Sequence, residues 1–231
     1  METSTNYSKT ADVRRADKSE NITLFRNVYL WMTMALFITG ATALTVSDSP
    51  TLLNAIFGSK VAFFGLIIAE LALVIILSSF IFRMSFLTAT LMFIAYSILN
   101  GATLASIFLL YTASSIASTF FVTAGTFGAM ALFGYFTKRD LSGMGKWLMV
   151  GAVVLMVGAI INVFVGSSAG MMAISVAAMG IFSAYMLYDI KQIIDGGETN
   201  YISATLALYM DVFNVFQSLL ALLGIMGGER D

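Results

Sequence analysis

Two aspartates lie in stretches of this chain that are otherwise apolar enough for a lipid bilayer. Asp189 closes the uncharged run from residue 179, and Asp211 interrupts residues 201 to 226, which carry no other charge. Ionisable residues inside membrane spans are rare, face the protein interior or a water-filled cavity, and mark ion or proton pathways. The two aspartates are therefore the first candidates for function.

The spacing of the two aspartates predicts that they meet. Asp211 lies about ten residues into its helix, roughly 15 Å deep at about 1.5 Å per residue, and Asp189 lies near the end of the preceding helix. Antiparallel neighbours joined through Gly196 and Gly197 would place both carboxyl groups at similar depths. Two carboxylates that close cannot both ionise cheaply in a low dielectric, so we expect them to share one proton and titrate as a unit.

When both groups ionise, they become hard oxygen ligands of the kind that Ca²⁺ prefers. Asp189 and Asp211 are therefore candidate metal ligands as well as candidate pH sensors. Asn214 and Ser218 follow Asp211 at i+3 and i+7, share its helix face, and are candidates to line the same pathway.

Two further charged residues fall in or beside an apolar run. Glu70 interrupts residues 61 to 82 and is a third candidate for the ion pathway. Arg83 closes that run; it serves as a membrane anchor and is also a candidate latch that neutralises the aspartates.

Composition places the chain in the membrane. Of its 231 residues, 59% are hydrophobic and 11% are charged, whereas charged residues make up about a quarter of a soluble domain. The chain has no cysteine and no histidine, which excludes disulfides, thiolate chemistry, imidazole bases and zinc sites of those types. The chain has no Walker-type glycine loop, which disfavours a primary pump. We expect no enzyme, no cofactor and, because a nucleic-acid site would need a clustered basic patch, no nucleic-acid partner.

Seven spanning helices follow from the gaps between charges. A span needs about 20 apolar residues, and the two longest uncharged runs divide at the polar clusters 112–115 and 166–170. The predicted fold is an all-α, seven-helix integral membrane bundle over residues 26–228, preceded by a polar cytosolic tail (residues 1–25) and followed by a short C-terminal tail (residues 229–231). The predicted spans are 26–46, 61–82, the two halves of 84–137, the two halves of 147–188, and 201–226.

The basic residues predict the orientation. Ten of the twelve Lys and Arg residues fall on the side of the N-terminus, and two, Lys60 and Arg230, fall on the other. Because basic residues are enriched in cytoplasmic loops, we expect a cytosolic N-terminus and, after seven spans, a C-terminus outside.

An ordered set of short motifs resembles the transmembrane Bax inhibitor motif family, in its bacterial branch. The motifs are residues 25–33 (FRNVYLWMT), 84–86 (MSF), 93–97 (FIAYS) with Gly101, 107–112 (IFLLYT), 118–125 (STFFVTAG), 134–142 (GYFTKRDLS), 187–189 (LYD) and 207–214 (ALYMDVFN).

This resemblance implies a seven-helix fold with the last helix central, a Ca²⁺ leak pathway, and a pH-sensing aspartate pair at Asp189 and Asp211. It implies an acid in the second span at Glu70 and a basic latch at Arg83, in a protein of the bacterial inner membrane. Eukaryotic relatives that suppress cell death often end in lysines, whereas this chain ends Gly-Gly-Glu-Arg-Asp231, so that role is not carried over.

The sequence thus predicts a pH-sensitive calcium leak channel gated by the aspartate pair, with the bilayer, calcium and protons as its partners. Two alternatives stay open: a non-conducting regulator that binds a membrane protease or channel, and a proton-coupled cation exchanger. An intramembrane aspartyl protease also needs two aspartates on neighbouring spans. Its second motif, Gly-x-Gly-Asp, reads Leu-Tyr-Met-Asp211 here, where large side chains would crowd a substrate strand.

Overall fold

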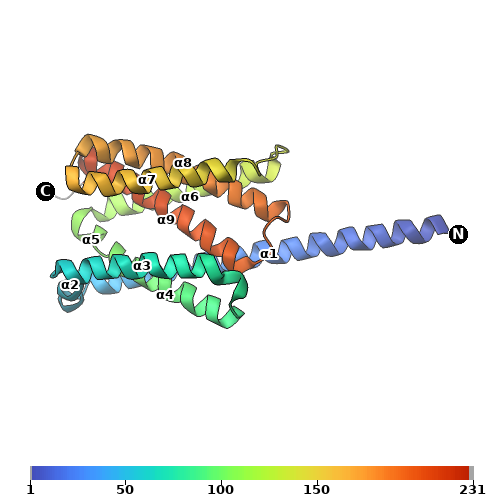
Figure 1. Cartoon of the computed structure of the whole chain (residues 1–231), viewed down its shortest axis with the longest axis horizontal. Coiled ribbons are helices and arrows are strands. Elements are labelled where there is room, and N and C mark those ends of the chain that lie inside the picture. The colour runs from blue at the N-terminus through green and yellow to red at the C-terminus, as the bar shows by residue number, and fades with distance from the viewer. Residues whose placement is uncertain (1, 229–231) are drawn as a thin grey trace.

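A computed structural model describes the backbone of residues 2–228 and the side chains of residues 23–227, and within that range it is helical with no β-strand. Seven helices are long and apolar enough to cross a membrane, which confirms the predicted seven-span bundle (Figure 1). They are α1 (Glu2–Ser47), α3 (Lys60–Phe80), α4 (Phe86–Leu104) continued by α5 (Ile107–Leu110), α6 (Ala113–Phe136), α7 (Met144–Val165), α8 (Ser168–Ile194) and α9 (Tyr201–Leu223). The short elements are α2 (Pro50–Phe57), η1 (Ile81–Arg83) and η2 (Gly224–Gly228).

The two polar clusters that were expected to divide the long apolar runs do so by capping helices. Thr112 accepts a hydrogen bond from the Ser115 backbone N–H at 3.2 Å and begins α6. Ser167 accepts one from Gly170 at 3.0 Å and begins α8. Such caps satisfy N–H groups that the first turn of a helix leaves unpaired. Gly166, with φ of 67°, ends α7 in the left-handed conformation that favours glycine.

Helical structure extends further than the sequence indicated at two places. Pro50, which follows the first predicted span, is the first residue of α2, where its missing N–H costs no hydrogen bond. The backbone of the predicted polar tail is also helical and runs into the first span as α1. No proline or glycine occurs before Gly40 to interrupt it.

The seven spans form two groups that α9 joins. Helices α1, α3 and α4 pack together, α6, α7 and α8 pack together, and α9 crosses between the groups and contacts both (Figure 1). Its side chains Leu208, Tyr209 and Val215 are completely buried. The last helix is therefore central, as the family resemblance implied.

Polar contacts in the core tie α9 to the first group. The Tyr209 hydroxyl lies 2.7 Å from Thr39 Oγ1, and Thr39 donates a 3.0 Å hydrogen bond to the Ser97 carbonyl. Tyr209 also meets Phe93 edge to face, with ring centroids 5.6 Å apart. These contacts fix the rotation of α9, and thus the direction in which Asp211 points.

Candidate functional site

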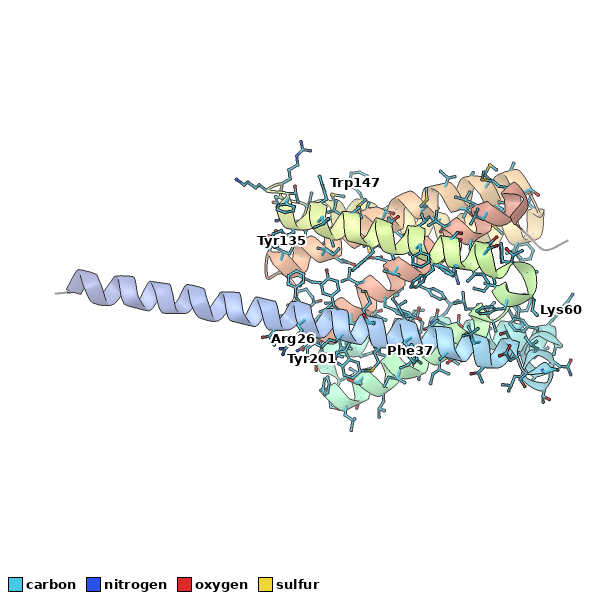
Figure 2. All side chains as sticks on the ribbon, turned by 180° about the vertical axis from the view of Figure 1, so that it is seen from behind. Arg26, Phe37, Lys60, Tyr135, Trp147 and Tyr201 are labelled. Carbon is cyan, nitrogen blue, oxygen red and sulfur yellow. The ribbon has the colours of Figure 1, made fainter. Side chains whose placement is uncertain are left out.

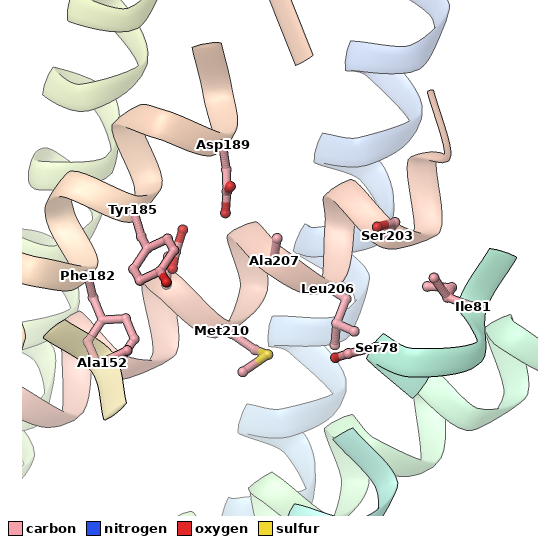
Figure 3. A pocket seen from close by; sticks show the side chains of 11 residues that line it. Ser78, Ile81, Ala152, Phe182, Tyr185, Asp189, Ser203, Leu206, Ala207 and Met210 are labelled. Carbon is pink, nitrogen blue, oxygen red and sulfur yellow. The ribbon is translucent and has the colours of Figure 1, made fainter. Parts of the chain in front are cut away.

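A cavity of about 370 Å³ lies beside α9, between α3 and α8 (Figure 3). It combines apolar walls with oxygen-bearing side chains. It is lined by Ser78, Ile81, Ala152, Phe182, Tyr185, Asp189, Ser203, Leu206, Ala207, Met210 and Asp211.

The structure brings Asp189 and Asp211 together in this cavity. Asp189 extends from α8 toward α9 (Figure 3), and the side chains of both aspartates line this one cavity. Asp211 is only 4% exposed, and its Oδ2 atom has no hydrogen-bond partner among the described residues. A buried carboxylate pays a large desolvation cost unless it is paired or protonated, so this pair demands a proton or a cation.

Three hydroxyl side chains line the cavity alongside the aspartates: Ser78 of α3, Tyr185 of α8 and Ser203 of α9. Sequence reasoning missed all three. For Tyr185, a signal existed, because it precedes Asp189 by one helical turn and so shares its face. Ser78 and Ser203 carry no comparable signal.

The polar side chains of the lining are carboxylates and hydroxyls, which are the oxygen ligands that a hard cation such as Ca²⁺ prefers. The described residues contain no group of three or more Asp, Glu, His or Cys side chains that could hold a metal. Two carboxylates and a few hydroxyls fit a transient, partly hydrated ion better than a resident one.

Glu70 lies apart from the aspartates. It does not line the aspartate cavity, is half-buried on α3, and accepts a hydrogen bond from the Thr103 hydroxyl of α4. The sequence predicted an interior-facing acid here, but it gave no sign of this partner on the following span.

Arg83 is exposed at the end of η1 and forms no ion pair with any side chain of residues 23–227. The ion pair in that range joins Lys191 Nζ to Asp195 Oδ1 at 2.9 Å, one helical turn apart at the end of α8. The structure therefore does not place the predicted latch on the aspartates.

Asn214 and Ser218 also lie outside the lining of the aspartate cavity. Asn214 Nδ2 donates to the Met210 carbonyl at 2.8 Å, and Ser218 Oγ donates to the Asn214 carbonyl at 2.7 Å. Both side chains thus bond back to their own helix.

A second cavity, of about 420 Å³, opens where η1 and the start of α4 face the α8–α9 connection. It is lined by Ile81, Phe82, Met84, Phe86, Ala89, Thr199, Asn200, Tyr201 and Ile202. Ile81 also lines the aspartate cavity and is only 3% exposed. This side chain therefore stands where the two cavities adjoin.

Comparison with known proteins agrees with this architecture. The family model described as "Inhibitor of apoptosis-promoting Bax1" matches residues 22–228. Inner membrane protein YbhL of Escherichia coli (strain K12) is 41% identical over 219 residues, covering 90% of this chain and 92% of the relative. A Caulobacter vibrioides protein is 34% identical over 246 residues, with 97% of each chain covered. A Borreliella burgdorferi protein is 35% identical over 207 residues, covering 85% of this chain and 89% of its own. Seven spans, a central last helix and a family match over nearly the whole chain lead to one conclusion: this chain belongs to the Bax inhibitor family of membrane proteins.

Proposed function

We propose that this protein is a pH-sensitive calcium leak channel of the bacterial inner membrane. The observation that carries the proposal is that Asp189 and Asp211, from different helices, line one cavity within the spans. The inner-membrane location rests on the likeness to the E. coli relative.

In the closed state, the aspartates share a proton, and α3, α8 and α9 pack around them. Removing that proton sets two negative charges side by side. At about 4 Å and an effective dielectric constant of about 20, their repulsion is about 4 kcal/mol. This is enough to shift a balance between two packings of the helices that differ by a few kcal/mol.

The ionised pair is also a site for a cation. A permeating Ca²⁺ would exchange part of its hydration shell for the two carboxylates and the hydroxyls of Ser78, Tyr185 and Ser203. It moves down its gradient, so the protein needs neither a cofactor nor an enzymatic reaction. Arg83, at the end of η1, is a candidate to neutralise the pair in a second closed arrangement, which requires movement of that element.

The test is calcium entry into liposomes that contain the purified protein, followed against pH. We expect flux to rise as pH increases and the shared proton is lost. Asp211→Asn removes the second negative charge, so its flux should no longer depend on pH. Equal pH dependence in the wild type and in Asp211→Asn would reject the sensor.

The same liposomes separate the alternatives. A proton gradient that drives Ca²⁺ uphill would identify an exchanger. An absence of flux at every pH, from protein that remains folded, would favour a non-conducting regulator.

A further inference from the structure

A second face of α9 borders an apolar groove of about 450 Å³ that neither the aspartates nor their cavity touches. One wall is α1, which contributes Leu36 and Gly40, and the opposite wall is α6, which contributes Ala117 and Phe120. Its floor is formed by Phe213 and Phe216 of α9. Figure 2 shows the arrangement: α9 crosses behind α1 and α6 in the space between them.

The groove offers almost nothing to a polar ligand. Its two hydroxyl side chains are Thr39 and Thr123, and each is already bonded inside the protein. Thr39 bonds to Ser97 and Tyr209, and Thr123 donates to the Thr119 carbonyl at 2.8 Å. A water molecule needs two to four polar partners, so this groove suits neither a water file nor an ion.

The surroundings of the groove determine what can enter it. Its lining comes from membrane-spanning segments, mostly from the halves of the first span and of α6 that lie toward Ser47 and Ala113. Outward-facing side chains continue the apolar surface on both sides, with Phe37 75% exposed and Phe121 72% exposed. The molecules present at that depth are lipid tails, which are as apolar as leucine.

We propose that the groove between α1 and α6 binds a phospholipid acyl chain, which enters from the side and packs against Phe213 and Phe216. The groove volume falls in the range of about 300–1,000 Å³ typical of sites for small ligands. With no polar group free to hold a headgroup, the tail is the part that is recognised.

The position of the groove gives this lipid a role in the bundle. The same helix presents Met210 and Asp211 to the aspartate cavity and Val212 and Phe213 to the groove. An acyl chain in the groove would thus fill the space into which α9 could move away from Asp189. The proposal does not depend on calcium conduction.

The experiment uses the full chain in phosphatidylethanolamine and phosphatidylglycerol vesicles with a trace of phospholipid that carries a diazirine in its acyl chain. After illumination, lipid adducts are located by peptide mass spectrometry. Because Phe213 and Phe216 are the α9 aromatic side chains that line the groove, we expect adducts at one of these two residues in addition to the outer faces of α1 and α6.

Two glycines provide a matched pair of variants, because an added Cβ meets nothing within 4 Å at Gly40 or at Gly65. Gly40→Leu places a side chain in the groove and should abolish the α9 adducts. Gly65→Leu, on the second span, should leave them unchanged. Ala117→Trp fills the groove from the opposite wall and serves if Gly40→Leu does not fold.

Adducts on the outer faces but none on α9 would overturn the proposal. Adducts at Phe213 or Phe216 that persist in a folded Gly40→Leu or Ala117→Trp variant would also overturn it. Calcium flux measured in parallel keeps the two proposals apart, because the adduct pattern does not require conduction.

Discussion

Asp211 is the acid that the fold buries most deeply, and its neighbour is another acid. Within the described chain, no basic side chain reaches it, and its Oδ2 atom is unsatisfied. A lone buried carboxylate is costly, so the arrangement is stable only while a proton or a cation occupies it. In the proposed channel, this dependence would serve as the sensor, and Asp189 would be the partner that shares the proton.

A matched control for the aspartates lies in the connection between α6 and α7. The Asp140 Oδ1 atom accepts a 2.9 Å hydrogen bond from the Ser142 backbone N–H, and this bond lowers the pKa of the Asp140 carboxyl. Because the pKa of Asp140 is lowered in the folded state, its ionised carboxylate stabilises the fold at any pH above the ordinary aspartate pKa of about 3.9. This stabilisation is lost only when the pH falls below that value.

Asp140→Asn should therefore keep the full pH response of calcium flux between about pH 5 and pH 8. Asp189→Asn should remove that response. The liposome assay checks both variants. Loss of the pH response in Asp140→Asn would show that the pH sensor lies in the loop between α6 and α7.

At the residue scale, the sequence indicates which acids lie in spans but not what surrounds them. Asp189 and Asp211 stand out because their neighbours in the chain are apolar. The contact between Glu70 and Thr103 depends on how two helices are rotated about their axes. The predicted roles of Asn214 and Ser218 assumed that a shared helix face means a shared cavity, yet both side chains bond to the backbone of α9 instead.

At the scale of elements, α1 and α4 pack closely together at Gly101. A Cβ on Gly101 would lie 2.5 Å from the Thr39 carbonyl oxygen and 2.7 Å from Thr42 Cβ. These contacts are backbone and a branched carbon, so they cannot move aside cheaply. The close packing of the two helices therefore depends on the missing side chain.

We predict that Gly101→Ala destabilises the protein by about 1–3 kcal/mol, the usual cost of overpacking. Gly125→Ala, where a new Cβ meets nothing within 4 Å, should be neutral or slightly stabilising because alanine favours helix. Denaturation in detergent measures both. Equal stability of the two variants would show that α1 and α4 can separate freely.

A second element-scale prediction concerns η1, the 3₁₀ turn that carries Ile81 between the two cavities. Ile81→Ala should speed the reaction of a single cysteine, Ser203→Cys, with a charged thiol reagent added from the cytosolic side. The native chain has no cysteine, so the background is clean. Ile75→Ala is the control, since Ile75 is 62% exposed on the outer face of α3. Unchanged labelling in Ile81→Ala would show that this side chain is no barrier.

Charge gaps predicted the elements well because a bilayer tolerates few charges and fixes the length of each span. Short elements escaped that reasoning. The short helix α2 begins at Pro50, and the third span ends in α5 after an interruption at Ala105 and Ser106. Neither feature changes the number of spans or the position of a charged residue, so the gaps between charges could not predict them.

For the whole molecule, the orientation in the membrane is a prediction that two cysteine variants can test. In intact bacteria with a permeable outer envelope, a membrane-impermeant reagent should label Ser59→Cys, between α2 and α3. The same reagent should reach Ser142→Cys, between α6 and α7, only after the inner membrane is opened. The reverse labelling pattern would show that the orientation in the membrane is opposite to the predicted one.

The central place of α9 has a consequence for how the protein is made. Synthesis proceeds from the N-terminus, so both helix groups enter the membrane before the helix that joins them has left the ribosome. Until then, Asp189 lacks its carboxyl partner and the core lacks Tyr209. The bundle can therefore assemble fully only after α9 has inserted. A truncated product that ends before Tyr201 would lack the contacts of α9 with both helix groups, and we expect membrane proteases to degrade it.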